Sequence, residues 1–422
     1  MEIFYVFAGL TILGLTGYGL QIWSVRAAFR ERDSDSGCED VNFPPVSILK
    51  PMKGLDDNLF DNLDSFCRQD YPEYEIVFSL QDYNDPAYKV ARKLKEKYPE
   101  KDISLIVERC DAGLNPKVNN LIPAYKAAKY ELILISDSNV MVEMNYLKEI
   151  VRKMKDPNVG LVSNLIGGVG GQTLGSIFEN LHLNSFVIGS VCFLDRFLKM
   201  PCVVGKSMLM RKHDLEAIGG LKAVKDILAE DYIIGKKMQK RGRKVILSNH
   251  LINNVNEYWG LKKFINRHTR WGKLRWKIGG IKYFSELVGN AVFMSCIPIL
   301  LWEPSKITIS FAAFVSFMKI LGDYYLGRII GTWRTETRRS GENESSIRQF
   351  SHSPVHCLLS PVKDLIIGLI WFVPLLSDTV VWRGNRYIIG KDSVLSTCPE
   401  GGVLSWRYRL IDVVRARFAR VA

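Results

Sequence analysis

Apolar runs at both ends of the chain, with a charged stretch between them, limit what this sequence can fold into. Ile3 to Trp23 contains no charged residue, and a helix of about 20 such residues spans a bilayer. A secretory signal begins basic and ends at a small-residue cleavage site, whereas this chain begins Met1-Glu2 and places Arg26 after the run. We therefore expect residues 1–25 to form an uncleaved signal-anchor, with the N-terminus outside and the following residues in the cytosol.

Three further apolar runs lie in the C-terminal third. They are Leu287–Trp302, Ile307–Leu326 and Leu365–Trp382. The second contains Lys319 and Asp323, which lie four residues apart and so share one helical face. There they form a pair, line a polar cavity or reach toward the membrane interface.

The last run contains Pro374, and a full crossing there would place a basic tail outside, against the charge rule. We expect it to be re-entrant or interfacial. Residues 281–383 are thus assigned to membrane segments with a basic cytosolic loop at 328–363, and residues 384–422 to a basic C-terminal tail whose end, 403–421, has the pattern of a surface helix.

The chain carries 57 Lys and Arg against 44 Asp and Glu, a net charge of +13. Much of this excess flanks the apolar runs, and no nucleic-acid-binding motif of interleaved aromatic and basic residues accompanies it, which favours an anionic membrane surface over nucleic acid as the partner. Its eight cysteines include no CxxC pair, which argues against a zinc site and gives no disulfide framework.

The middle of the chain, residues 34–276, alternates short β-rich runs with helical patterns. The expected strands are Val46–Leu49, Ile76–Leu80, Ile103–Val107 and Leu132–Ile135, and the expected helices are Leu59–Arg68, Ala87–Tyr98, Asn119–Ala128 and Asn145–Met154. This alternation predicts an α/β fold with a Rossmann-like parallel sheet. Ligands bind beyond the carboxyl ends of such strands, so the polar residues there are the candidates for function.

Four polar segments stand at the ends of predicted elements. They are Gln81-Asp82, Asp137-Ser138-Asn139, Glu230-Asp231-Tyr232 and Arg267-His268-Thr269-Arg270-Trp271. Each has a structural explanation when taken alone. The two strand-end aspartates suit caps and turns, the acidic pair suits a helix start, and the Arg-Trp pair suits a membrane interface.

Six segments in order resemble the inverting GT-A glycosyltransferases, and more closely the ceramide glucosyltransferase family (glycosyltransferase family 21) with its bacterial hopanoid-glycosylating relatives. The segments are VSILKPMKG (46–54), QDYNDPA (81–87), NPKVNNL (115–121), ISDSN (135–139), AEDY (229–232) and RHTRW (267–271). The resemblance implies a cytosolic GT-A catalytic domain, one N-terminal transmembrane helix and a C-terminal region of membrane helices.

The resemblance also implies roles for individual residues. Asp82 would contact the nucleotide, Asp137 would hold a divalent cation bridging the diphosphate, and Asp231 would be the general base. The second acidic position of the metal motif is Asn139 here. Diphosphate and acceptor contacts would come from Arg267, Arg270 and Trp271.

The implied reaction is the transfer of a hexose, glucose from UDP-glucose, to a primary hydroxyl of a membrane lipid such as ceramide or a hopanoid, with inversion to a β-glycoside. Mn²⁺ or Mg²⁺ would neutralise the leaving diphosphate. From the residues themselves, Lys117 is a further candidate for binding the donor. The alternatives are a processive polysaccharide synthase and a non-catalytic scaffold that binds anionic lipids.

Three other features lie outside the predicted site. Lys50, after the first strand, either approaches phosphate or belongs to a solvated loop. Gly167–Gly171 is interpreted as a flexible loop on the acceptor side, because it lacks a preceding strand and a GxGxxG pattern. His182 belongs to no motif that aligns locally, so it is left out.

Overall fold

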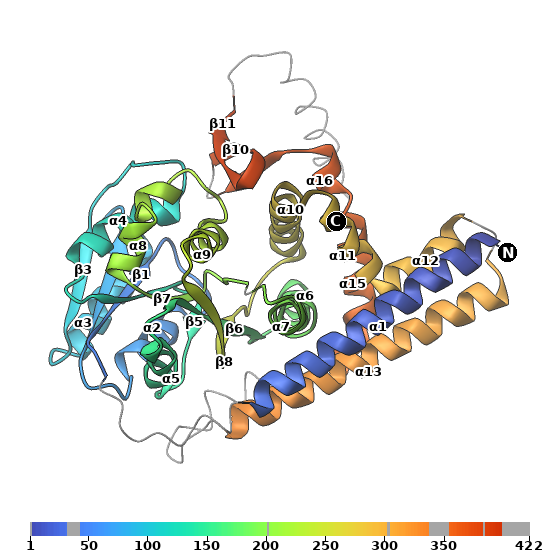
Figure 1. The fold of residues 1–422 in the computed structure, drawn as a ribbon, viewed down its shortest axis with the longest axis horizontal. Helices are drawn as coiled ribbons and strands as arrows, with labels where there is room; N and C mark the ends of the chain where they lie inside the picture. Colours follow the sequence, from blue (N-terminus) through green and yellow to red (C-terminus); the bar gives the residue numbers. More distant parts are fainter. Residues whose placement is uncertain are drawn as a thin grey trace.

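The computed structural model describes residues 2–31, 43–200, 202–301, 304–336, 354–382 and 385–398. These form a rounded α/β domain from which long helices project (Figure 1). The surface helix expected at 403–421 and part of the basic loop, residues 337–353, lie outside the described residues.

An eight-stranded mixed sheet forms the centre of the domain, in the order β3-β2-β1-β4-β7-β6-β8-β5. Its strands are β1 (Val46–Pro51), β2 (Tyr74–Leu80), β3 (Ile103–Val107), β4 (Leu132–Ser136), β5 (Val140–Met141), β6 (Val159–Val169), β7 (Ser207–Arg211) and β8 (Lys244–Val255). The first four positions are all parallel, as predicted. Strand β7 runs antiparallel to both β4 and β6. The predicted α/β class is thereby confirmed.

Helices cover both faces of this sheet, because successive strand residues point to opposite sides. Ile48 and Leu134 pack into one core with α2 (Leu59–Cys67), α3 (Pro86–Lys97) and α5 (Tyr146–Arg152). Their neighbours Leu49 and Ile133 pack into a second core on the opposite face. That core includes α4 (Pro116–Ala127), α8 (Lys212–Ala217) and α9 (Glu230–Lys240).

Helix α4 begins three residues earlier than predicted, and its first turn explains why. The Asn115 side chain accepts hydrogen bonds from the backbone N–H groups of Lys117 and Val118, at 2.9 and 3.1 Å. Pro116 occupies the first helical position, where its missing N–H has no consequence. The Asn-Pro-Lys segment is therefore a helix start that fixes the position of Lys117.

The glycine-rich stretch is not the flexible loop that the sequence suggests. Gly167, Gly168 and Val169 complete the long, buried strand β6. A Cβ on Gly168 would lie 2.6 Å from the Asn180 side chain, so glycine permits helix α6 (Leu174–His182) to pack closely on the strand. The chain continues through a π-helical turn (Leu183–Val187) into α7 (Ile188–Leu198).

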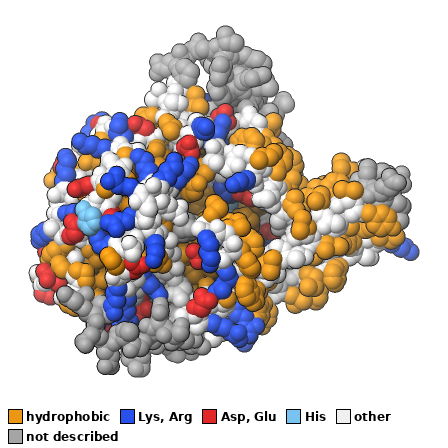
Figure 2. Space-filling view, in the orientation of Figure 1, with side chains coloured by type: hydrophobic (Ala, Val, Ile, Leu, Met, Phe, Trp, Pro, Cys, Tyr) orange, Lys and Arg blue, Asp and Glu red, His pale blue; other side chains and the backbone are white. Residues whose placement is uncertain are grey.

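The projecting part contains α1 (Glu2–Arg30) and α13 (Lys306–Glu336), which lie side by side (Figure 1). Its surface is predominantly hydrophobic, whereas Lys and Arg side chains are scattered over the rounded domain (Figure 2). Among the described residues, four helices are long and apolar enough to cross a membrane. One of them, Leu174–Leu198, is mostly buried inside the protein.

The apolar run Leu287–Trp302 is bent close to its start. Helix α10 (Leu261–Gly279) leads through a short turn into α11 (Phe284–Gly289), and α12 (Ala291–Leu301) then departs at 78°. Asn290 makes the break, because its side-chain oxygen accepts from Phe293 N at 3.1 Å and its amide donates to the Asp364 carbonyl at 2.7 Å.

The fourth apolar run folds as two short helices, α15 (Ser360–Ile370) and α16 (Val373–Leu376). The chain then enters a three-stranded sheet of β9 (Thr379–Trp382), β10 (Asn385–Ile389) and β11 (Leu395–Thr397). This sheet packs on Leu228 and Leu274 of the α/β domain. Leu228 N donates to the Ser393 carbonyl at 2.9 Å, so the small sheet supports the loop that leads into α9.

Lys319 and Asp323 of α13 form a buried ion pair, one of the arrangements that the sequence leaves open. Lys319 Nζ lies 2.5 Å from Asp323 Oδ1 and 3.8 Å from Asp364 Oδ2 on α15. Tyr18 of α1 donates to the same Asp323 oxygen at 2.5 Å. The pair therefore ties α1, α13 and α15 together.

Candidate active site

The centre of the candidate site is Asp137, the first residue after β4. Its Oδ1 lies 2.9 Å from Lys117 Nζ and its Oδ2 lies 3.0 Å from Lys206 Nζ. Burial alone would raise the pKa of Asp137, but the two ammonium groups hold that pKa well below its usual range. Asp137 is therefore a permanent carboxylate between two cations.

Lys117 connects this carboxylate to the second acidic segment. Besides Asp137, its ammonium contacts Glu230 Oε1 at 3.0 Å and donates to the Gly205 carbonyl at 2.9 Å. Burial opposes the charge, yet Asp137 and Glu230 raise the pKa of Lys117 above its ordinary value. The predicted donor-binding lysine thus lies beside two of the predicted segments.

Lys206 was not among the predicted site residues. Its ammonium lies 2.6 Å from Asn139 Oδ1 and 3.0 Å from Asp137 Oδ2. One oxygen of Asn139 and one of Asp137 therefore face the same ammonium group. Burial lowers the pKa of Lys206, Asp137 raises it and the nearby Arg267 lowers it further. Ser207 pairs with Ser136 across antiparallel strands, which places Lys206 beside Asp137.

Asp231 occupies the second position of α9 and is held by two backbone donors. Gly205 N donates to its Oδ2 and Tyr232 N to its Oδ1, each at 2.7 Å. Burial, followed by the neighbouring Glu230, raises the pKa of Asp231 to about 6. A Cβ at position 205 would lie 2.6 Å from the Asp231 carboxylate, so only glycine permits this approach. Such a carboxylate can accept a proton near neutral pH.

The arginine-tryptophan segment lies on α10 and divides into two parts. The Arg267 guanidinium lies 4.3 Å over the Trp271 ring, and its Nε lies 3.1 Å from Glu179 Oε1. His268 Nε2 lies 2.9 Å from the other Glu179 oxygen. Arg270 instead has its guanidinium 5.9 Å over Trp382 of β9.

Asp82 lies apart from these contacts, at the exposed end of β2. Its Oδ1 accepts hydrogen bonds from Asn84 N at 2.9 Å and from the Asn84 side chain at 3.1 Å. These bonds stabilise the turn after β2, which is the structural explanation given above for an aspartate at a strand end. Within the described ranges, no hydrogen bond or ion pair joins Asp82 to Asp137 or Asp231.

Lys50 is neither solvated nor turned toward an open site. Its side chain is fully buried, its ammonium lies 3.6 Å over the Phe66 ring, and it donates to the Asp137 carbonyl at 2.7 Å. Burial lowers its pKa well below the ordinary value. Lys50 therefore fixes the backbone of the segment that carries Asp137.

Comparisons with known proteins identify the family of the chain. Residues 6–395 match the family described as glycosyl transferase family 21. Two curated relatives come from Caenorhabditis elegans. Ceramide glucosyltransferase 3 is 33% identical over 351 residues, 83% of this chain and 73% of the relative. Ceramide glucosyltransferase 1 is 28% identical over 364 residues, 82% of this chain and 72% of the relative.

Among solved structures, a mannosyltransferase from Pyrobaculum calidifontis in complex with GDP-Man and Mn²⁺ aligns at a TM-score of 0.47 and 15% identity, covering 88% of this chain and 97% of that one. A likeness this distant places no ligand in the present site. The family match covers nearly the whole chain and is supported by relatives of similar extent. The chain therefore belongs to glycosyl transferase family 21 and is a glycosyltransferase that acts on lipid.

Proposed function

We propose that the protein transfers glucose from UDP-glucose to a primary hydroxyl of a membrane lipid such as ceramide, with inversion at the anomeric carbon. The observation that carries this proposal is the partly buried Asp231 carboxylate, which two backbone N–H groups hold and whose pKa is raised to about 6, beside the Lys117–Asp137 ion pair. A base of that pKa can accept the acceptor hydroxyl's proton in a single displacement, and no covalent intermediate is needed.

The donor end of the site is assigned to the cationic groups around Asp137. Lys117, Lys206 and Arg267 supply positive charge from α4, the start of β7 and α10. Ammonium and guanidinium groups bind phosphate oxygens well, because they match them in charge and hydrogen bonding. The Trp271 ring, held under Arg267, offers a flat face to the sugar or the lipid head. Asp82 is proposed to contact the nucleotide, and Arg270 to stand at the acceptor side.

A divalent cation fits this site in a limited way. Asp137 and Asn139 direct oxygens toward one cationic position, which the Lys206 ammonium fills. Among the described residues, no cluster of three or more His, Cys, Asp or Glu side chains could hold a metal. Mg²⁺ often binds through one or two carboxylates plus phosphates and water. Asp137 would hold the cation together with the donor diphosphate, and the cation would neutralise charge on the leaving group.

We further propose that the protein is a multi-pass membrane protein, with the α/β domain and the three-stranded sheet facing the cytosol and the N-terminus outside. The arginines at the C-terminal end of α1, Arg26 and Arg30, favour this orientation. Residues 379–397 pack on the α/β domain, so both lie on the same side.

Lipid mass spectrometry of a heterologous host, with and without the protein, tests the proposal. A new monohexosylated ceramide is expected with the wild-type chain and not with Asp231→Asn. A polymeric product would identify a polysaccharide synthase instead. A lipid profile that the wild-type chain leaves unchanged in a host supplied with ceramide would refute the proposal.

A further inference from the structure

A cavity lies where the α/β domain meets the projecting helices. Its empty volume is about 800 Å³, part of it open to solvent, and it is lined by residues of α1, α6, α10 to α13 and α15. None of the groups assigned above to the donor or to the base lines it.

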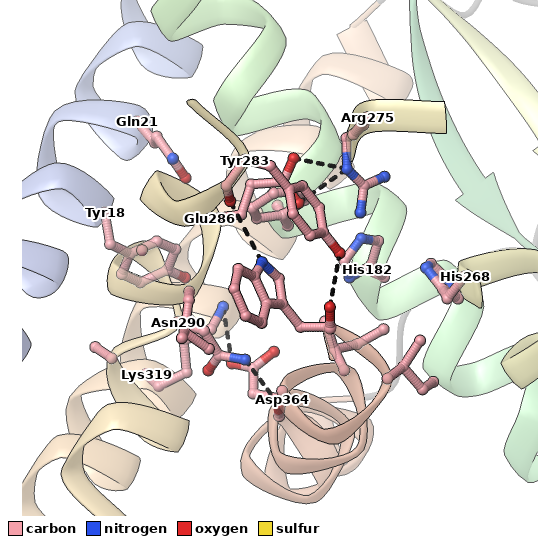
Figure 3. Close-up of a pocket in the computed structure, with 18 of the residues that line it drawn as sticks. Tyr18, Gln21, His182, His268, Arg275, Tyr283, Glu286, Asn290, Lys319 and Asp364 are labelled. Carbon is pink, nitrogen blue, oxygen red and sulfur yellow. Dashed lines mark hydrogen bonds and ion pairs between the residues drawn. The ribbon is translucent and has the colours of Figure 1, made fainter. Parts of the chain in front are cut away.

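The cavity has an apolar side and two polar ends. Leu15 of α1 and Ile367 and Ile370 of α15 supply aliphatic surface. Tyr283 stacks on Trp371 with ring centroids 5.0 Å apart, and together they form an aromatic wall. In Figure 3, His182 and His268 lie at one end, while Tyr18 and Lys319 lie at the other. A lipid has this combination of hydrocarbon and polar groups.

The formal charges that line the cavity are balanced by ion pairs. Arg275 Nε lies 2.7 Å from Glu286 Oε1. Lys319 is paired with Asp323 at 2.5 Å and lies 3.8 Å from Asp364. A phosphate placed here would be removed from water without a matching charge, which is costly. The cavity therefore favours an uncharged head group.

His182 is the feature that calls for a ligand. It is 2% exposed, and within the part of the chain that the structure describes neither ring nitrogen has a hydrogen-bond partner. Its ring touches Phe186 and His268, with centroids 4.9 and 4.4 Å away. Buried polar groups are nearly always hydrogen-bonded. A hydroxyl or amide group in the cavity would supply the missing partner.

The cavity adjoins the residues that were assigned to the reaction. His268 lines the cavity and also lies next to Trp271, with ring centroids 5.6 Å apart. The same histidine shares Glu179 with Arg267. A head group bound by His182 would thus lie beside the Arg267–Trp271 pair.

We infer that this cavity holds the head of the acceptor lipid, an uncharged lipid bearing hydroxyl and amide groups, through a hydrogen bond to the His182 ring. The inference rests on the proposed function and adds the place and chemical class of the acceptor. The lipid's hydrocarbon follows the apolar side formed by α1 and α15.

The first test measures transfer from UDP-glucose to a ceramide with a short fluorescent acyl chain, using the full chain in detergent. His182→Phe keeps a ring but loses both nitrogens, and is expected to raise the KM for ceramide about tenfold, the equivalent of one hydrogen bond. The KM for UDP-glucose should not change. His182→Gln, which keeps hydrogen-bonding capacity, should restore part of the loss.

A second pair of variants tests the cavity without changing His182, so the test does not depend on correct folding of the His182 variants. Ile367→Trp places bulk in the cavity and should also raise the KM for ceramide. Leu369→Trp is the matched control, because Leu369 lies on the same helix but is 64% exposed and does not line the cavity. It should behave as the wild type. Ceramide bearing a terminal phosphate should compete at least tenfold less well than ceramide.

The outcomes separate the inference from the proposed function. Transfer to no lipid by the wild-type chain would refute the function. Transfer with a wild-type KM for ceramide in both His182→Phe and Ile367→Trp would refute the cavity as the acceptor site. Equal competition by the phosphorylated ceramide would refute the selection for an uncharged head.

Discussion

Replacing Asp231 by asparagine tests the proposed base most directly. The change removes the proton acceptor while keeping the size of the side chain. General-base catalysis contributes about 10²- to 10⁴-fold, so kcat should fall by that factor, about 2.7 to 5.4 kcal/mol in the activation barrier. UDP binding should persist, because Asp137, Lys117 and Lys206 keep their contacts.

The same change has a structural cost that can be worked out from the two backbone donors. Gly205 N and Tyr232 N each donate to one carboxylate oxygen. An asparagine amide offers only one oxygen, so one of these N–H groups faces an NH₂ group and loses its acceptor. An unsatisfied buried donor costs about 1 to 3 kcal/mol. The variant should therefore melt at a lower temperature while still being stabilised by UDP.

The pH profile gives a second readout of the same base. Asp231 has a pKa raised to about 6, so it is protonated and inactive below that pH, and kcat/KM should rise as pH increases through 6. Glu230→Gln is the informative control. Glu230 raises the pKa of Asp231, so its neutralisation should move the rise to lower pH without abolishing transfer.

Radiolabelled transfer to ceramide, measured across the pH range around 6, decides the matter. Wild-type turnover by Asp231→Asn, or an unchanged rise in activity for Glu230→Gln, would show that the proton is accepted elsewhere.

Three other predictions follow from the contacts. Asp137→Ala removes the carboxylate proposed to hold the divalent cation, so UDP-glucose binding in the presence of Mn²⁺, measured by calorimetry, should weaken at least tenfold. Chelation of divalent cations should reduce wild-type transfer but not the residual activity of this variant. Asp323→Asn breaks a buried ion pair and should cost about 3 to 5 kcal/mol, seen as a lower melting temperature in detergent, whereas Lys306→Met on the exposed start of α13 should not. A reporter enzyme that works only in the cytosol should be active when it is fused after residue 422. Activity of a reporter that works only on the outer side would contradict the proposed topology.

The parallel half of the fold could be predicted because each strand is a short apolar run followed by a polar residue. Ile76–Leu80 and Ile103–Val107 were placed within two residues of the observed strands. The end of β4 likewise located Asp137. What periodicity cannot give is the pairing of strands that are distant in sequence. Lys206 was missed for that reason, since only the antiparallel pairing of β7 with β4 brings it beside Asp137.

The membrane-side features depended on tertiary contacts of another kind. Hydropathy located the apolar run that begins at Leu287, but the break at Asn290 depends on a hydrogen bond to the Asp364 carbonyl, from a segment far along the chain. His182 has no sequence signal of its own, and its importance lies in a cavity assembled from α1, α6, α10 to α13 and α15. Gly168 wrongly suggested a flexible loop, because the absence of a side chain there instead permits β6 to pack closely against α6.

Helix α10 explains how chemistry on a water-soluble donor can be joined to an acceptor in a membrane. His268, Trp271 and Arg275 recur at intervals of three and four residues, so they share one face of the helix. Trp271 at one point on this face supports Arg267, and Arg275 on the next turn lines the cavity. Because a helix holds side chains a turn or two apart at a fixed distance, this face of α10 fixes Trp271 relative to the part of the cavity that Arg275 lines. A substitution that bends α10 between Trp271 and Arg275 should therefore reduce transfer more than it reduces binding of either substrate.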